Sequence, residues 1–140
     1  MKESSKSNQQ LLRMALRGNA GFSVLSATII LFWRDGLIRW LGIPRDFGIL
    51  FLGIGLIVFA VWLLLNSAQT PIKLPAARTA VVMDLAWVVA SIAVLVLAPL
   101  TSQGKRVITI IALIVLGFAL SQWVGIRRIT YSNVREVSRD

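Results

Sequence analysis

One carboxylate in this sequence lies inside an apolar stretch, where an acid is costly. The chain has six acidic residues, and Asp84 alone falls within a segment apolar enough to cross a membrane. An aspartate at the centre of a bilayer costs about 2.5–3.5 kcal/mol on insertion scales. Such residues commonly mark a functional site or a polar contact between helices, so Asp84 is the first residue to consider for chemistry.

Three interpretations of Asp84 remain open from the sequence. As a structural group, it would bond to Asn19, Ser23 or Trp87, or pair with Arg17 or Arg78 at the membrane rim. As a protonatable group, it would couple proton movement to transport. As a contact group, it would meet a partner helix or a lipid head group. Its expected place is near the interface, in the first turns of its span, where the helix dipole favours an anion.

The residue types that most enzymes need are missing. The chain has no Cys and no His. This excludes thiol redox chemistry, thiolate metal sites and His-ligated haem, and it removes the commonest general base. The sequence also has no Ser-His-Asp set, no paired carboxylates and no phosphate-binding loop. We therefore predict a non-enzymatic protein with no catalytic residues, no metal and no cofactor.

Four apolar segments must position Asp84. The hydrophobic fraction is 56%, and the excess over soluble domains is concentrated in long blocks. The spans are expected at about residues 18–33, 48–65, 80–100 and 107–126, with an interfacial lead-in helix before the first. The sequence thus predicts an all-α protein, a four-transmembrane-helix bundle that forms a single membrane domain over residues 1–140.

Polar and amphipathic segments join and flank these spans. Residues 1–10 and 127–140 are expected to be polar tails, the first of them mobile. Between the first two spans, an amphipathic segment is expected to lie in the membrane interface, anchored by Trp40. Pro71 and Pro75 are expected to stop helices in the next connector. The short segment between the third and fourth spans is expected to be a tight polar turn.

The basic residues predict the orientation of the chain. Four spans place both termini on one side, and ten of the 15 Lys and Arg residues lie on that side. These ten are Lys2, Lys6, Arg13, Arg17, Lys73, Arg78, Arg127, Arg128, Arg135 and Arg139. Because basic residues are enriched in cytoplasmic segments, both termini are predicted to be cytoplasmic. The predicted location is the bacterial cytoplasmic (inner) membrane, with several passes.

The net charge of +9 is expected to meet membrane lipids rather than nucleic acid. The basic residues sit beside apolar blocks, where they set topology and contact anionic head groups. No basic run is long enough to resemble a nucleic-acid-binding tail. A second copy of the chain, or another protein of a membrane complex, is the other expected partner.

Small and polar residues form stripes that are expected to face the inside of the bundle. Small residues let membrane helices approach closely, and short polar side chains bond across them. The stripes are Asn19, Ser23, Ser26 and Ala27 in the first span, Gly48, Gly55, Phe59, Trp62 and Asn66 in the second, Asp84, Val88 and Ser91 in the third, and Thr109, Gly117, Ser121 and Gly125 in the fourth. The predicted intramembrane polar cluster is Asn19, Ser23, Asp84, Trp87 and Ser91.

The two halves of the chain are similar in the order of these residues. The Asn, Phe and Ser that start at Asn19 have the same spacing as the Asp, Trp and Ser that start at Asp84. With two spans in each half, such a repeat would be parallel, related by an axis along the membrane normal. An ancestral repeat and a chance similarity between apolar spans both remain open.

Two short motifs mark the starts of the first and third spans. They are R-x-N-x-x-F-S, made by Arg17, Asn19, Phe22 and Ser23, and D-L-A-W-V, made by residues 84–88. Through them the chain, over roughly residues 11–126, resembles a group of small four-span bacterial integral membrane proteins of unknown function. The resemblance implies a bacterial cytoplasmic membrane and a four-helix bundle, and it implies no activity.

The function favoured by these features is a non-enzymatic accessory or scaffold bundle. The absence of a catalytic residue set is its main support. The alternative is a small proton-coupled or lipid-handling transporter that uses Asp84, and it is supported by the intramembrane acid and the polar stripes.

Overall fold

The computed structural model describes residues 2–42 and 48–137, and it is almost entirely helical. The helices are α1 (Lys2–Phe32), α2 (Arg34–Leu41), α3 (Gly48–Ala68), α4 (Leu74–Leu97) and α5 (Ser102–Val137). The described residues contain no strand, so the all-α prediction is confirmed. The helices α1, α3, α4 and α5 each contain a segment long and apolar enough to cross a membrane.

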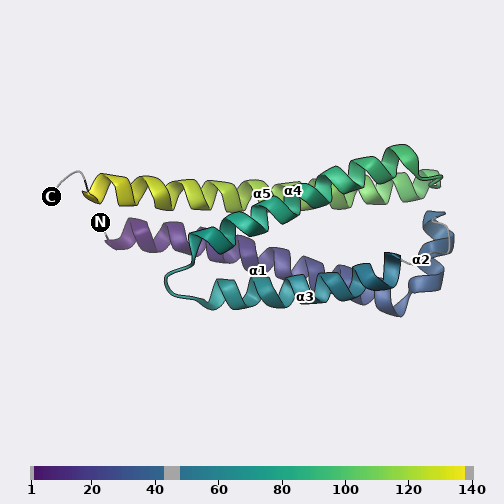
Figure 1. Ribbon diagram of the computed structural model, residues 1–140, viewed down its shortest axis with the longest axis horizontal. Helices are drawn as coiled ribbons and strands as arrows, with labels where there is room; N and C mark the ends of the chain where they lie inside the picture. The colour runs from purple at the N-terminus through teal and green to yellow at the C-terminus, as the bar shows by residue number, and fades with distance from the viewer. Residues whose placement is uncertain (1, 43–47, 138–140) are drawn as a thin grey trace.

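The four long helices form two antiparallel hairpins that pack together. One hairpin pairs α1 with α3, the other pairs α4 with α5, and α1 also packs along α5. Figure 1 shows both termini and the connection from α3 to α4 at one end of the bundle, with α2 at the opposite end. Beyond that connection, the start of α1 and the end of α5 continue outward as a helical pair (Figure 1).

The two hairpins do not pack with the symmetry that a two-fold repeat would produce. The direction of α1 matches that of α4, as a parallel repeat requires (Figure 1). A two-fold axis would also make the contact between α1 and α5 equivalent to that between α3 and α4. Instead α1 packs closely along α5, whereas α3 makes few contacts with α4.

Both terminal segments, which are predicted to be polar tails, are helical in their described parts. The helix α1 begins at Lys2, and α5 continues to Val137. The reason is that the two helices pack on each other beyond the apolar spans, where Leu12 and Ile129 are buried in one core. Residues 138–140 of the predicted second tail lie outside the described residues.

Pro75 begins a helix instead of stopping one. It lies in the first turn of α4, which starts at Leu74. A proline is tolerated there because its missing N–H would have no partner within the helix. Pro71 lies in the non-helical connector, as predicted. The predicted polar turn before the fourth span is helical from Ser102 onward, because it forms the first turn of α5.

The amphipathic segment after the first span is the helix α2. Ile38 and Leu41 are buried, whereas Arg39 and Trp40 on the other side of the helix are exposed. The alternation of buried and exposed positions agrees with the amphipathic segment that the sequence predicts. Its last part, residues 43–47, lies outside the described residues.

Thr101 joins the end of α2 to the start of α5. Its hydroxyl donates to the carbonyl of Trp40 at 2.9 Å and accepts from the N–H of Gly104 at 3.0 Å, as a helix-capping side chain does. Its own N–H donates to the carbonyl of Leu41 at 3.1 Å. Gly42 follows the last residue of α2, and its φ of 75° favours glycine. These bonds hold α2 against the bundle.

The buried core lies in the half of the bundle nearest the termini. All four long helices and the connector between α3 and α4 contribute to it. Its members are Leu12, Leu16, Ala20, Ala60, Leu63, Ile72, Ala77, Ala80, Val81, Ala119, Ile126 and Ile129. Alanines make up a large part of this set, so the helix backbones can approach closely where the polar residues of the first and third spans meet.

The predicted inward stripes are correct for the first and third spans and wrong for most of the fourth. Asn19 and Ala27 are buried, as are Asp84 and Ser91. In the fourth span Thr109, Gly117 and Ser121 are exposed, and in the second Gly48 and Gly55 are exposed. Gly125 of the predicted stripe is buried, and the larger buried residues of α5 are Ala112, Val115, Ala119, Gln122, Ile126 and Ile129. Their alternating spacing of three and four residues is the pattern of helix–helix packing, and it outweighs the stripe of small residues.

Candidate functional site

Asp84 lies in the interior of the bundle with both of its carboxylate oxygens bonded. The Nδ2 of Asn19 donates to Oδ1 at 2.9 Å and to Oδ2 at 2.7 Å. The Nε2 of Gln122 donates to Oδ2 at 3.0 Å. The exposed fractions are 1% for Asn19, 2% for Asp84 and 0% for Gln122. These three residues, which we call the Asp84 cluster, join α1, α4 and α5.

The small residues around the Asp84 cluster allow its short side chains to meet. Asn19 is followed by Ala20, Asp84 is four residues after Ala80, and Gln122 is three residues after Ala119. These three alanines are fully buried or nearly so. Without larger side chains between the helices, an asparagine and an aspartate from different helices can reach each other directly. The helix packing thus positions the cluster.

The charge of Asp84 is met by amide groups. Both of its hydrogen-bond partners are neutral side chains, and Arg17 and Arg78, which were predicted as rim partners, are exposed. Hydrogen bonds to an ionised acceptor are roughly twice as strong as those between neutral groups. They are also stronger in a medium of low dielectric constant than in water. The amide donors therefore take the place of a counter-ion.

The prediction that Asp84 lies in the first turns of its helix is wrong. The helix α4 begins at Leu74, ten residues before Asp84. At a rise of about 1.5 Å per residue, this is about 15 Å along the helix. The helix dipole acts within roughly the first turn, so it does not stabilise this carboxylate. Asn19 and Gln122 do so instead.

The other residues of the predicted polar cluster lie near Asp84 without bonding to it. Ser23 is buried one turn beyond Asn19 on α1, and Trp87 is half-buried on α4. The hydroxyl of Ser91 donates to the carbonyl of Trp87 at 2.9 Å, within its own helix. In the described part of the chain, the side-chain bonds of Asp84 come from Asn19 and Gln122.

No match came from comparisons with known protein families, with curated proteins or with solved structures. The resemblance to the four-span bacterial group therefore stays a prediction. What the Asp84 cluster can do has to be derived from its own residues and their geometry.

Gln122 is the member of the Asp84 cluster that the sequence reasoning missed. The stripe chosen for the fourth span followed the small residues and included its neighbour Ser121, which is exposed and bonds to the carbonyl of Gly117. A usable signal was present, because Gln122 is the one side-chain amide among residues 107–126. A large polar side chain inside a span is costly unless it finds a partner.

The chemistry available to the Asp84 cluster is hydrogen bonding. Within the described residues, no three His, Cys, Asp or Glu side chains gather in a way that could hold a metal ion. The Oε1 of Gln122 is buried and has no hydrogen-bond partner among the described groups. The side-chain amide can turn. Its Oε1 can then accept a hydrogen bond from an O–H or N–H group, whereas its Nε2 donates one to a carboxylate.

Proposed function

We propose that this chain is a non-enzymatic accessory or scaffold protein of the bacterial cytoplasmic membrane. The observation that supports this is the bonding of Asp84, whose two oxygens both accept hydrogen bonds from neighbouring helices. A carboxylate held in this way fixes the positions of three helices relative to one another. It serves as a polar tie between the two hairpins.

An accessory role requires a partner, which is either a second copy of the chain or another membrane protein. We expect a stoichiometric partner, or a defined oligomer, when the tagged chain is purified from its native membrane in a mild detergent. The untagged chain expressed from the same locus serves as the control for proteins that bind the resin. A monomer without partners in several mild detergents would contradict the accessory role.

We also propose that both termini are cytoplasmic. Cysteines introduced by Ser7→Cys and Ser132→Cys are expected to react with a membrane-impermeant maleimide only after the membrane is opened. Ser102→Cys, at the opposite end of the bundle, is the matched control and is expected to react in intact spheroplasts. The measurement has no background because the chain has no Cys. The opposite labelling pattern would reverse the orientation.

One observation favours a second function, a small proton-coupled or lipid-handling transporter. The unpartnered Oε1 of Gln122 lies on the same amide whose Nε2 donates to Asp84. If Asp84 takes up a proton, the amide can turn and its oxygen can accept the new O–H group. The Asp84 cluster could then hold Asp84 in either protonation state without losing a bond.

Proton flux into liposomes distinguishes the two functions. The scaffold proposal predicts that liposomes containing the wild-type chain take up protons no faster than empty liposomes. The transporter alternative predicts uptake that Asp84→Asn abolishes while the protein stays folded. Asn19→Ala is a useful companion, because it removes one donor to Asp84 and keeps the carboxylate. Wild-type uptake that depends on Asp84 would overturn the scaffold proposal.

A further inference from the structure

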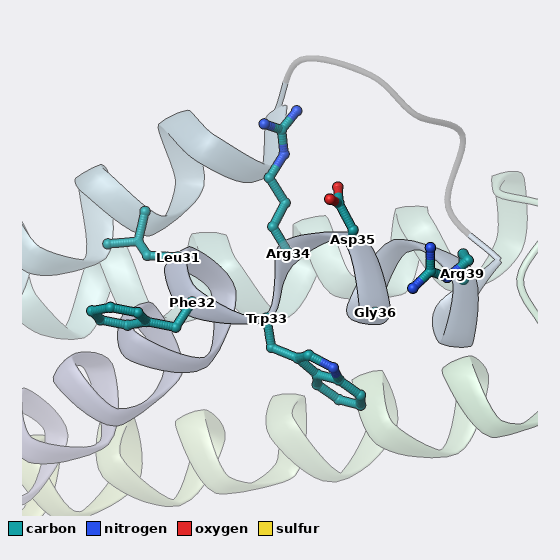
Figure 2. Close-up of a pocket in the computed structure, with 7 residues that line it drawn as sticks. All are labelled: Leu31, Phe32, Trp33, Arg34, Asp35, Gly36 and Arg39. Atoms are coloured by element: carbon teal, nitrogen blue, oxygen red, sulfur yellow. The ribbon is translucent and has the colours of Figure 1, made fainter.

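An open surface cavity lined by both apolar and charged side chains lies where α1 ends and α2 begins. Its volume is about 410 Å³, and it is lined by residues 31–36 and by Arg39. Figure 2 shows the side chains of Arg34 and Asp35 on one side of the bend between the helices and that of Trp33 on the other. The residues that line the cavity belong to the end of α1, to α2 and to Trp33 between them, and α2 lies at the end of the bundle away from the termini (Figure 1).

The lining of the cavity changes from apolar to charged side chains within a few residues. Leu31 and Phe32 complete the membrane-length segment of α1, and the side chain of Phe32 is 88% exposed. Arg34, which is also exposed, begins α2. The rings of Trp33 and Trp40 lie 6.3 Å apart at this bend. Tryptophan is enriched at the boundary between membrane and water, so we expect the cavity at the depth of phospholipid head groups.

The charges of the cavity favour an anion that carries phosphate. The lining residues carry two guanidinium groups, those of Arg34 and Arg39, and one carboxylate, that of Asp35. A guanidinium fits a phosphate with paired hydrogen bonds, which an ammonium group does not provide. Lys105 and Arg106 are exposed near the start of α5, at the same end of the bundle, and they add positive charge there.

We propose that this cavity binds an anionic phospholipid of the leaflet at the α2 end of the bundle. The guanidinium groups of Arg34 and Arg39 hold the phosphate, and an acyl chain covers Leu31 and Phe32. The carboxylate of Asp35 accepts hydrogen bonds from the hydroxyl groups of a glycerol head group. A free phosphate would use the arginines and leave the ring of Phe32 in water, so the cavity suits an amphiphile better. The proposal does not depend on the accessory role.

Quenching of tryptophan fluorescence by brominated lipids tests this binding. Trp62→Phe, Trp87→Phe and Trp123→Phe together leave emission from Trp33 and Trp40. In phosphatidylcholine vesicles, brominated phosphatidylglycerol is expected to quench this emission strongly. The quenching should correspond to a local fraction of phosphatidylglycerol around these tryptophans about five-fold above its fraction in the vesicle. Arg34→Gln or Arg39→Gln is expected to lower the enrichment below about two-fold. Both arginines are exposed, so neither substitution disturbs the core.

Arg106→Gln is the matched control, because Arg106 is exposed at the same end and does not line the cavity. It is expected to leave the enrichment nearly unchanged. Three results would overturn the proposal: equal quenching by brominated phosphatidylcholine or phosphatidylethanolamine, loss of enrichment in excess inorganic phosphate, or an equal loss in Arg106→Gln. Native mass spectrometry provides the same test on the chain with all its tryptophans. It compares the phosphatidylglycerol bound to this chain with that bound to the same arginine variants.

Discussion

Asp84→Ala is expected to destabilise the folded bundle by about 2 kcal/mol, which lowers the ratio of folded to unfolded protein roughly 30-fold. The substitution removes the acceptor for Asn19 and for Gln122, and both amides then remain buried without that partner. Hydrogen bonds between membrane helices average roughly 0.6 kcal/mol each, and this site loses three. The cost of placing a carboxylate in the membrane is present in folded and unfolded spans alike. It therefore largely cancels from the difference in free energy between the two states.

Unfolding in SDS, followed by tryptophan fluorescence, measures this loss. Asp84→Asn is expected to lose much less stability than Asp84→Ala, because its oxygen can accept from Asn19 and its new N–H can donate to the free Oε1 of Gln122. Ser91→Ala is the matched control on α4, since the hydroxyl of Ser91 bonds within its own helix. Equal losses for Asp84→Ala and Ser91→Ala would show that the Asp84 cluster does not join the helices.

Gly125→Leu is expected to destabilise the contact between α1 and α5 by roughly 1–3 kcal/mol. A Cβ at Gly125 would lie 3.0 Å from the Cβ of Leu12 and 3.2 Å from its Cα. Carbon atoms pack best at about 3.5–4.0 Å, so the new side chain must push the backbone of α1 away. Leu12 is fully buried in the core, and displacing it also loosens the contacts around it.

Gly117→Leu, two turns earlier on the same helix, is the control for this second prediction. A Cβ at Gly117 meets no atom within 4 Å, and the position is exposed. Its stability in the same SDS titration is expected to change by less than about 0.5 kcal/mol. If the two leucine variants unfold at the same SDS concentration, the inference that α1 and α5 approach closely at Gly125 is wrong.

Two of the three residues of the Asp84 cluster could be predicted from the sequence. Asp84 was evident because a charge inside an apolar span is rare, and Asn19 was evident because it occupies the equivalent position in the first span. Gln122 was missed because the stripe of small residues in its span was taken as the inward face. The inward face is instead set by Ala119 and Ile126, which pack against the other helices and turn Gln122 toward Asp84.

The all-α class, the four membrane-length helices and the amphipathic helix between the first two follow from composition and periodicity alone. These features are local, because a long apolar run in lipid must satisfy its own backbone hydrogen bonds and therefore forms a helix. The rotation of each helix about its axis is not local, since in lipid almost every face is apolar and periodicity identifies no inside. That rotation depends on contacts between helices, such as Leu12 against Gly125. It is this packing that buries Gln122 beside Asp84 and leaves Gly117 facing outward.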